Sequence, residues 1–449
     1  MTSDDISLYR TGKAFKLVDA DLDITWIIHA FSFLLNDPNK KLVIEGEHTE
    51  YKFIKPEELE KQDHVPALEE GMRRVLPGPV ITDGLNQLRD DHDNGAEVLA
   101  MTALETLKKA VDGVDLANVK SAEEFWKELR LAAWMLGRNG RPDMGPAIQG
   151  GLSKALLAIA GGVAQNGGNC FEKERLETFG LEDMKSAARE GIEEIMEVRR
   201  TRMRGLSSSF VELVTASGPY QWRISSEKAI NILTLSYSSS VTKALKDLIA
   251  RAREDNMKIH LKILESRPRF DGVAFVKDLF KSPLDQSGDG MKHVKVDILS
   301  DACVALAAKH CDLVVIGSDK MSADGDVSNK IGSLPACLLA KTLQPKSKVV
   351  VIATTDKITS TNEKDLVEEP KDYAAHEMTQ SYPYELATML KKVAQIHGAM
   401  LCVKNPYFEW VPAKWVDFYV TEEGVMDRSH LKGYALKKLE LEEKLFEGV

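Results

Sequence analysis

Acidic, basic and amide side chains follow one short apolar run in the second half of the chain. The run, Leu313 to Ile316, has the length and the β-branched content of a buried strand. The loop after it carries Asp319, Asn329 and Lys330, before a helix that we expect to open near Ser333. In parallel α/β sheets, ligands bind beyond the carboxyl ends of the strands, because loops and helix N-termini converge there. We therefore expect the binding pocket at this loop.

A serine-rich turn follows a second apolar run, ILTL. It contains Ser236, Ser238, Ser239 and Ser240 and leads into a helical pattern. Hydroxyls and unpaired backbone N–H groups at a helix N-terminus favour an anion such as phosphate. The alternative is a helix N-cap with spare serines. The turn is neither a Walker loop nor a GxGxxG turn, so it does not indicate a nucleoside triphosphate or a dinucleotide.

Charged residues also follow the other predicted strands. They are Arg267, Asp301, Lys357 and Glu422. Arg267 could bind a phosphate or pair with Asp319, whereas Asp301 by itself predicts only a helix N-cap. The recurrence of such groups at strand ends is a stronger signal than any one of them, and it predicts a shared polar edge of the sheet.

The elements that must position these residues form a strand, loop and helix rhythm from about residue 229. The six candidate strands are Asn231 to Leu235, Ile259 to Leu264, Val294 to Leu299, Leu313 to Ile316, Val349 to Ala353 and Asp417 to Thr421. Helical patterns separate most of them, as in 241–253 and 300–309. The fold class is therefore predicted to be α/β, with a Rossmann-like, doubly wound and mostly parallel sheet.

A helical pattern precedes this sheet, from Gly95 to about Met203. Between two of its predicted helices lies the loop 138–145, which contains Arg141 and reads most simply as an interhelical turn. A later charged helix, predicted over 181–202, ends in a run of arginines. Such a run is typical of a solvated face or of a salt-bridged helix between domains.

The first 80 residues carry no recognisable chemistry. Trp26 to Leu35 is apolar all round and predicts a buried helix or strand, and 41–55 alternates in the manner of a hairpin. We place domain boundaries so that an extension covers 1–80, a helical domain 81–225, the sheet domain 226–425 and a C-terminal helix 426–449. That last helix is predicted over 431–446.

Composition excludes several classes of function. A net charge of -10 in 449 residues argues against a surface that binds nucleic acid directly. The five cysteines form no CxxC pair, so we expect buried free thiols in a reducing compartment and no metal or other cofactor. The N-terminus lacks a secretory signal, and no unbroken apolar run approaches the roughly 18 residues of a membrane span. These features predict a cytoplasmic protein.

Five stretches between about residues 229 and 425 resemble one known family, in the family's order. They read ILTLSYSSSV, ILESRPRFDG, DILSDACVALAAKHCDLVVIGSDKMSADGDVSNKIGS, VVVIATTDKI and NPYFEWVPAKWVDFYVTEEGV. The family joins the alpha, beta and delta regulatory subunits of eukaryotic translation initiation factor 2B to isomerases of methylthioribose-1-phosphate and ribose-1,5-bisphosphate. Residues 94–160 resemble its N-terminal helical domain. The resemblance implies a helical domain on a Rossmann-like domain, a dimer through the latter and a pocket between the two.

The resemblance also implies roles for individual residues. Asp319 matches the acid of the isomerases. The ligand-binding positions are matched by Arg141, Ser238, Ser239, Ser240, Asn329, Lys330 and Lys357.

One departure from the family pattern bears on activity. The isomerases have a cysteine that moves a proton together with the aspartate, and Ser236 occupies its place here. A thiol can supply a thiolate near neutral pH, whereas an unactivated hydroxyl cannot. An arginine expected before Gly95 is also replaced, by Asn94.

These departures favour a non-catalytic regulator of the initiation factor 2B type. It would be a homodimer that binds a sugar phosphate or a nucleotide monophosphate. Two alternatives for its assembly stay open: it joins other initiation factor 2B subunits, or it is a divergent paralogue that stays outside the larger complex. The alternative is a sugar-phosphate isomerase that uses Asp319 with another base, and a third hypothesis is that the pocket is vestigial.

Overall fold

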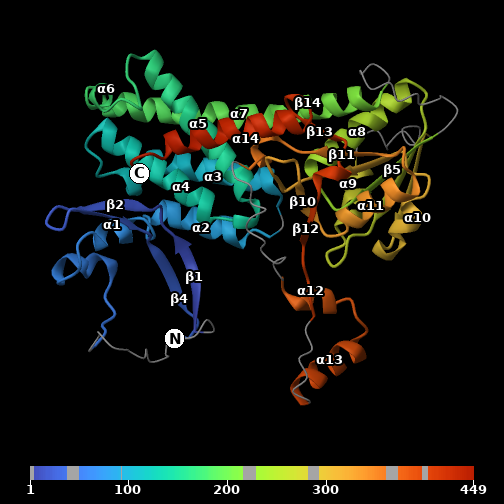
Figure 1. Ribbon diagram of the computed structural model, residues 1–449, viewed down its shortest axis with the longest axis horizontal. Helices are drawn as coiled ribbons and strands as arrows, with labels where there is room; N and C mark the ends of the chain where they lie inside the picture. The colour runs from blue at the N-terminus through green and yellow to red at the C-terminus, as the bar shows by residue number, and fades with distance from the viewer. Residues whose placement is uncertain are drawn as a thin grey trace. The chain divides into compact units, whose positions relative to one another are not determined.

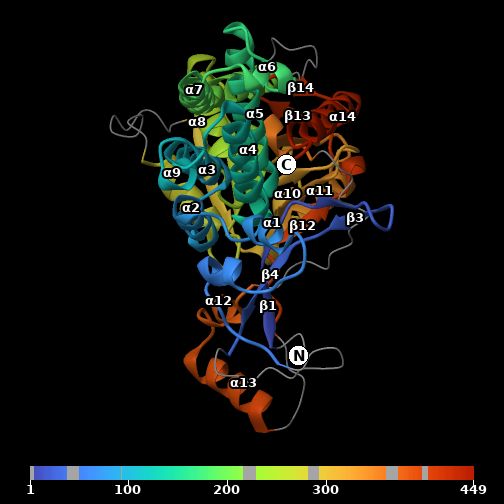
Figure 2. The ribbon, with the colours of Figure 1, turned by 90° about the vertical axis from the view of Figure 1, so that its left-hand side faces the viewer.

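The structure is a computed structural model that describes residues 5–37, 50–92, 94–215, 229–281, 293–359, 373–396 and 403–449. The chain forms two compact units, the first made of Met1–Glu197 with Leu441–Val449 and the second of Val198–Glu440. The boundaries predicted at residues 80, 225 and 425 stay predictions. Figure 1 and Figure 2 show the order of the elements along the chain.

The first unit begins with two antiparallel strand pairs. Strand β1 (Ile6–Thr11) pairs with β4 (Phe31–Leu35), and β2 (Phe15–Asp19) pairs with β3 (Ile24–Ile28). The prediction that 26–35 is buried was wrong, because Trp26 and Phe31 are 51% and 50% exposed. Two-stranded pairs expose much of both faces unless another layer covers them. The hairpin predicted over 41–55 falls largely outside the described residues, and 50–55 forms no strand.

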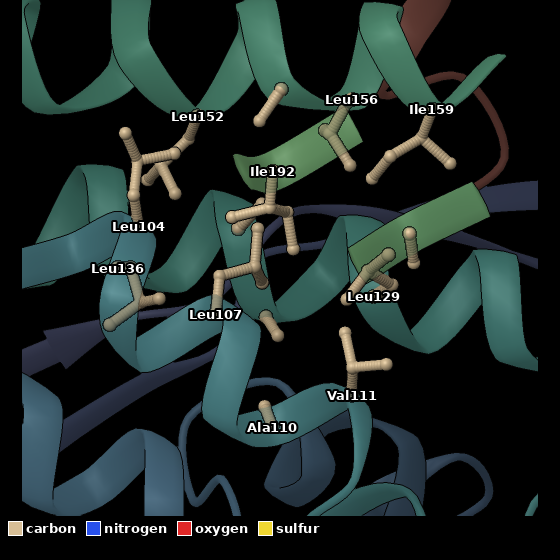
Figure 3. Close-up of a cluster of buried hydrophobic side chains, with 14 of the residues drawn as sticks. Leu104, Leu107, Ala110, Val111, Leu129, Leu136, Leu152, Leu156, Ile159 and Ile192 are labelled. Carbon is tan, nitrogen blue, oxygen red and sulfur yellow. The ribbon is translucent and has the colours of Figure 1, made fainter. Parts of the chain in front are cut away.

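Helices make up the rest of the first unit. They are α1 (Leu68–Arg73), α2 (Pro79–Asp90), α3 (Ala96–Val111), α4 (Ala122–Asn139), α5 (Gly145–Gln165), α6 (Lys173–Glu177) and the first part of α7 (Leu181–Val214), with 3-10 turns η1 (Pro56–Lys61), η2 (Val114–Leu116) and η3 (Pro142–Met144). Their apolar faces meet in one core, where Leu107, Leu129, Ile159 and Ile192 come from four different helices (Figure 3). The predicted helical pattern therefore reflects packing in a shared core.

One helical stretch of the described residues, Pro142–Gln165, is long and apolar enough to cross a membrane, with 61% of that window buried. Its helix α5 lines the core of the first unit through Ile148, Leu152 and Leu156. A helix that is apolar on most sides is expected at the centre of a helical bundle.

The second unit is built on a sheet of seven strands. They are β5 (Ile230–Leu235), β6 (Ile259–Leu264), β7 (Val294–Leu299), β8 (Leu313–Ile316), β11 (Lys348–Ile352), β13 (Phe418–Thr421) and β14 (Gly424–Met426), in the order β14-β13-β11-β8-β5-β6-β7. All neighbours are parallel except β13 and β14. This sheet confirms the predicted fold class.

Helices cover both faces of this sheet. One face packs against the end of α7, α8 (Ser239–Glu254) and α9 (Asp271–Leu279). The other packs against α10 (Val304–Ala308), α11 (Ser333–Leu343) and α14 (Arg428–Leu445). Because successive strand residues point to opposite faces, Ile232 and Leu233 belong to different cores.

A smaller antiparallel sheet contains β9 (Lys320–Met321), β10 (Val327–Lys330) and β12 (Phe408–Val411), in the order β12-β10-β9. The prediction that Asn329 and Lys330 lie in a loop was therefore wrong. Both lie on β10, which pairs with β12 about 80 residues later, and a four-residue polar strand has no signal in the local sequence. Helices α12 (Ala375–Thr379) and α13 (Tyr384–Ile396) extend away from the large sheet (Figure 1).

Four cysteines lie in the described residues, and all four are free. Cys170, Cys311 and Cys337 are buried as expected, whereas Cys303 is partly exposed. Cys402 lies outside the described residues.

Candidate functional site

The topology of the large sheet indicates where a ligand would bind. The chain runs outward from β5 through β6 to β7, and then returns to β8 on the other side of β5 before running through β11 to β13. The strand order thus reverses between β5 and β8. In doubly wound folds the crevice outside the carboxyl ends of such strands holds the ligand. Ser236 follows β5 and Gly317 follows β8, so the predicted polar edge lies at this switch point.

Ser236 lies in a tightly held turn. Its φ angle of 65° is in the left-handed region, and its backbone N–H donates to the hydroxyl of Ser266 at 2.7 Å. The backbone N–H groups of Ser266 and Arg267 donate to the carboxylate of Asp301 at 2.9 and 2.8 Å. The turns after β5, β6 and β7 are thus joined by hydrogen bonds. Asp301 orders the turn after β6, a role that the sequence did not predict.

The Ser236 hydroxyl has no base bonded to it among the residues that the structure describes. In the part of the chain that the structure describes, no hydrogen bond links this hydroxyl to a carboxylate or an imidazole. The neighbouring Tyr237 hydroxyl lies 3.4 Å from Asp278, and its pKa is raised by burial and by that carboxylate. A serine hydroxyl does not ionise near pH 7 unless a neighbouring base activates it.

The following serines differ in exposure. Ser238 is the N-cap of α8, and its hydroxyl accepts from the backbone N–H of Val241 at 3.4 Å. Ser239 is exposed, whereas Ser240 is 2% exposed. The structure thus shows Ser238 as a helix N-cap. Anion binding at this turn stays a prediction.

Ser238 and Asn329 flank the backbone of Gly317. A Cβ atom at Gly317 would lie 3.1 Å from the Ser238 hydroxyl and 3.5 Å from the Asn329 amide oxygen. Asn329 donates through its amide to Ser333 at 2.8 Å, at the start of α11. The structure therefore brings Ser238 and Asn329 together across the switch point.

Lys330 is a buried cation beside this group. Its side chain is 7% exposed, its Nζ lies 2.7 Å from the carboxylate of Asp271, and it sits 4.6 Å from the centre of the Tyr407 ring. Burial, followed by the hydrogen bond to Glu377, raises the pKa of the Tyr407 hydroxyl. A phosphate that reached Lys330 would compete with Asp271 for it. The sequence singled out neither Asp271 nor Tyr407.

Asp319 and Lys357 lie beyond the end of β8. The backbone N–H of Asp319 donates to the carbonyl of Ser328 at 2.9 Å, which ties the turn to β10. Lys357, which is 6% exposed, donates to the carbonyl of Ser318. The Lys357 ammonium thus contacts the backbone carbonyl of the residue that precedes Asp319.

Arg267 and Arg141 make contacts elsewhere. The Arg267 guanidinium donates to the hydroxyl of Ser381, just beyond α12, and lies 5.7 Å from the centre of the Phe270 ring. Arg141 belongs to the first unit, where it donates to the carbonyl of Asp91. The predicted pocket between two domains stays a prediction.

A cavity of 620 Å³ lies in the first unit, and the pocket expected at the strand ends stays a prediction. Residues of α5 and α7 line it, among them Gly161, Gly162, Asp183 and Glu190. Three acidic side chains, Asp183, Glu190 and Glu194, belong to its lining. No lysine or arginine of the described residues lines it, which does not favour a phosphate.

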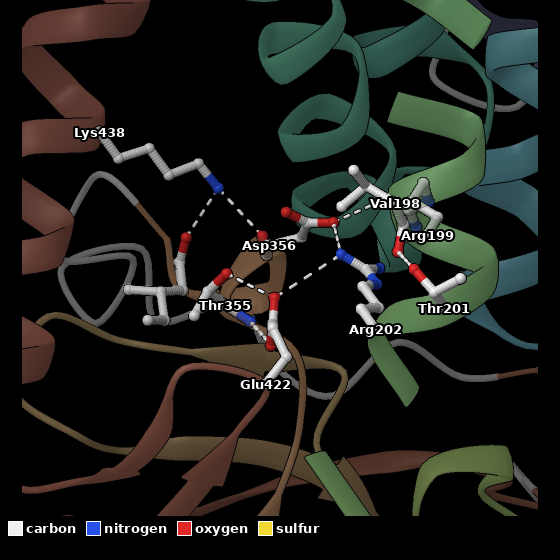
Figure 4. Close-up of polar contacts among 9 residues, drawn as sticks. Val198, Arg199, Thr201, Arg202, Thr355, Asp356, Glu422 and Lys438 are labelled. Atoms are coloured by element: carbon white, nitrogen blue, oxygen red, sulfur yellow. Dashed lines mark hydrogen bonds and ion pairs between the residues drawn. The ribbon is translucent and has the colours of Figure 1, made fainter. Parts of the chain in front are cut away.

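The arginines at the end of the charged helix divide into two classes. Arg200 and Arg204 are exposed, as expected for a solvated face. Arg199 and Arg202 are buried and form ion pairs with Asp356 (Figure 4). The alternation follows from helical geometry, because residues three apart share one face of a helix.

Comparison with protein families gives a match over most of the chain. The sequence model of the Initiation factor 2 subunit family matches residues 92–428, which is most of the chain. The strand pairs at the N-terminus lie outside this match.

Several curated proteins are similar in sequence. The ribose 1,5-bisphosphate isomerase of Archaeoglobus fulgidus is 24% identical over 346 residues, covering 77% of this chain and 89% of that protein. The ribose 1,5-bisphosphate isomerase of Methanocaldococcus jannaschii is 28% identical over 187 residues, covering 41% and 52%. The methylthioribose-1-phosphate isomerase of Ectopseudomonas mendocina is 27% identical over 181 residues, covering 40% and 45%. The chain therefore spans about half the length of two of these three relatives.

Solved structures share the fold. The translation initiation factor eIF-2B of Pyrococcus horikoshii superposes with a TM-score of 0.51 and 17% sequence identity. The superposition covers 78% of this chain and 97% of that protein's chain. The 5-methylthioribose 1-phosphate isomerase of the same organism has a TM-score of 0.51 and 20% identity, and covers 80% and 87%. Initiation factors and isomerases thus have the same architecture, so fold alone does not distinguish these functions.

Proposed function

Since the chain belongs to the Initiation factor 2 subunit family, we propose that it is a regulatory protein of the initiation factor 2B type that binds a phosphorylated ligand without converting it. The ligand is a sugar phosphate or a nucleotide monophosphate, held at the switch point between β5 and β8. As part of the same proposal, the protein acts in the cytoplasm as a homodimer, with other initiation factor 2B subunits as partners.

The observation that carries this proposal is that a serine, Ser236, follows β5 where the resemblance implies a cysteine. An aldose-ketose isomerase needs a base that removes a proton from carbon, and the family cysteine is replaced here by an alcohol. No carboxylate or imidazole is bonded to that alcohol within the described residues. The proposal is further supported by polar side chains near the end of β8, since the Lys357 ammonium contacts the carbonyl of Ser318, and Asn329 and Lys330 lie on the neighbouring β10.

The test of ligand binding is the thermal stability of the purified protein with ribose-1,5-bisphosphate. A ligand that binds only the folded state stabilises it by about 2.7 kcal/mol at a concentration of about 100 Kd. We expect an upward shift in Tm that is lost in Lys330→Ala and kept in Lys346→Ala, an exposed lysine ahead of β11. No shift with the wild type, or an equal loss in both variants, would contradict ligand binding at this site and favour the vestigial pocket.

A second candidate function is sugar-phosphate isomerisation through Asp319. It is favoured by the names of the curated relatives, which are isomerases of ribose 1,5-bisphosphate and methylthioribose-1-phosphate. Incubation with each of these two substrates, followed by detection of the ketose product, distinguishes the candidates. We expect no turnover. Turnover that is abolished in Asp319→Asn would establish the isomerase and refute the non-catalytic proposal.

A further inference from the structure

A buried ionic cluster lies next to the proposed ligand site without being part of it. The Asp356 carboxylate is fully buried and accepts from the guanidinium groups of Arg199 and Arg202, whose side chains are 2% and 5% exposed. The Arg202–Asp356 distance is 2.5 Å. Figure 4 shows both arginines approaching the carboxylate from α7. A buried carboxylate that joins two buried cations is costly to desolvate, and loss of one partner would leave an uncompensated buried charge.

Further contacts hold the same turn from other directions. Asp356 is the middle residue of the 3-10 turn η6 (Thr355–Lys357). Glu422, after β13, accepts from the Thr355 backbone N–H at 3.0 Å and from its hydroxyl at 2.8 Å. Lys438 of α14 donates to the carbonyls of Asp356 and Ile358 at 3.0 and 2.8 Å. Residues from α7, the end of β13 and α14 therefore all fix η6.

The last residue of this turn is Lys357. Its ammonium group reaches the carbonyl of Ser318, the residue before Asp319. A lysine side chain has four rotatable carbon–carbon bonds and normally points to water, so burying it in one place needs a backbone that does not move. Lys357 is therefore the neighbour of Asp356 in a turn that α7, the end of β13 and α14 all contact.

We propose that Asp356, with Arg199 and Arg202, is a positioning residue that holds Lys357 at the carboxyl end of β8, ready for the phosphate group of the ligand. The inference rests on the proposed function for the role of Lys357 toward the ligand. The placement of Lys357 by Asp356 can be measured without any ligand.

The placement is tested by lysine acetylation of the ligand-free protein, followed by mass spectrometry. Lys262 is the internal reference, because its ammonium group donates to two carbonyls of the same unit at 3.0 and 2.9 Å. In Asp356→Asn we expect the labelling rate of Lys357 to rise several-fold while that of Lys262 is unchanged. In Lys438→Met, which removes a partly exposed contact to the same turn, we expect a smaller rise at Lys357.

Two results would overturn the inference. One is an unchanged rate at Lys357 in either folded variant, and the other is an equal rise at Lys357 and Lys262, which would mean general loosening. If Asp356→Asn does not fold, Lys438→Met decides alone. Ribose-1,5-bisphosphate should then bind Asp356→Asn as weakly as it binds Lys357→Met, and equal binding to Asp356→Asn and wild type would reject the link to the ligand. If the wild type does not bind ribose-1,5-bisphosphate, the proposed function fails. The labelling rates still test whether Asp356 holds Lys357 in place.

Discussion

Removal of the Asp301 carboxylate should loosen the turn after β6. In the native protein this carboxylate accepts from the backbone N–H groups of Ser266 and Arg267 at 2.9 and 2.8 Å, and Ser266 is 2% exposed. A hydrogen bond to a charged group contributes about 1.5–3 kcal/mol, and a buried donor left unsatisfied costs its desolvation. We expect Asp301→Ala to lower the free energy of unfolding by about 3 kcal/mol, the low end for two such bonds, since Asp301 is partly exposed. Asp301→Asn keeps one acceptor oxygen and should lose about half of that amount.

The assay combines urea unfolding with hydrogen exchange of a peptide that covers residues 264–271. Asp297→Ala is the matched control, because that carboxylate in the same unit pairs with His260 and Lys295 at partly exposed positions. Such surface pairs contribute about 0–1 kcal/mol. The reasoning is refuted if Asp301→Ala unfolds at the same urea concentration as Asp297→Ala and the amides of 264–271 exchange no faster than in the wild type.

Three further predictions concern glycines and thiols. Gly272→Ala should lower the free energy of unfolding by about 2 kcal/mol or more, because its Cβ would lie 1.9 Å from the carbonyl oxygen at the end of β6. Gly161→Ala, inside α5 with nothing within 4 Å, should raise it by about 1 kcal/mol; urea titration measures both, and matching signs would contradict the steric argument. Iodoacetamide should modify Cys303 before Cys170 and Cys311. Burial raises the pKa of the latter two thiols to about 12, and only a thiolate reacts. Peptide mass spectrometry after timed alkylation checks the order in which the three cysteines are modified. The unfolded chain releases these two thiol protons near pH 9, whereas the folded chain holds them to about pH 12. The free energy of unfolding should therefore fall as the pH rises from about 9 to about 12. A urea midpoint at about pH 10.5 that is no lower than the midpoint at about pH 8 would refute the raised pKa of these thiols.

Six of the seven strands of the large sheet were predicted from the sequence, all except β14. The predicted ranges for β6, β7 and β8 agree with the structure residue for residue, and β5, β11 and β13 agree within one residue at each end. The central strands β8 and β11 are buried on both faces, so each appears as a short run of Val, Ile and Leu with a polar break at its end. Strands β6 and β7, toward the edge of the sheet, instead alternate apolar with polar residues. The polar break marks the carboxyl edge, and for this reason the candidate site residues could be named before the fold was known.

The partners of those residues depended on the tertiary structure. Asp301 meets the turn at Ser266 about 35 residues away, and Lys330 meets Asp271 about 60 residues away. The buried pair of Arg202 with Asp356 joins residues that are 154 positions apart. A local pattern reports which residues can be apolar or polar on one element, because burial acts on each element's own period. A local pattern does not indicate which distant carboxylate pairs with a given cation, because these residues come together only when the sheet and its covering helices pack.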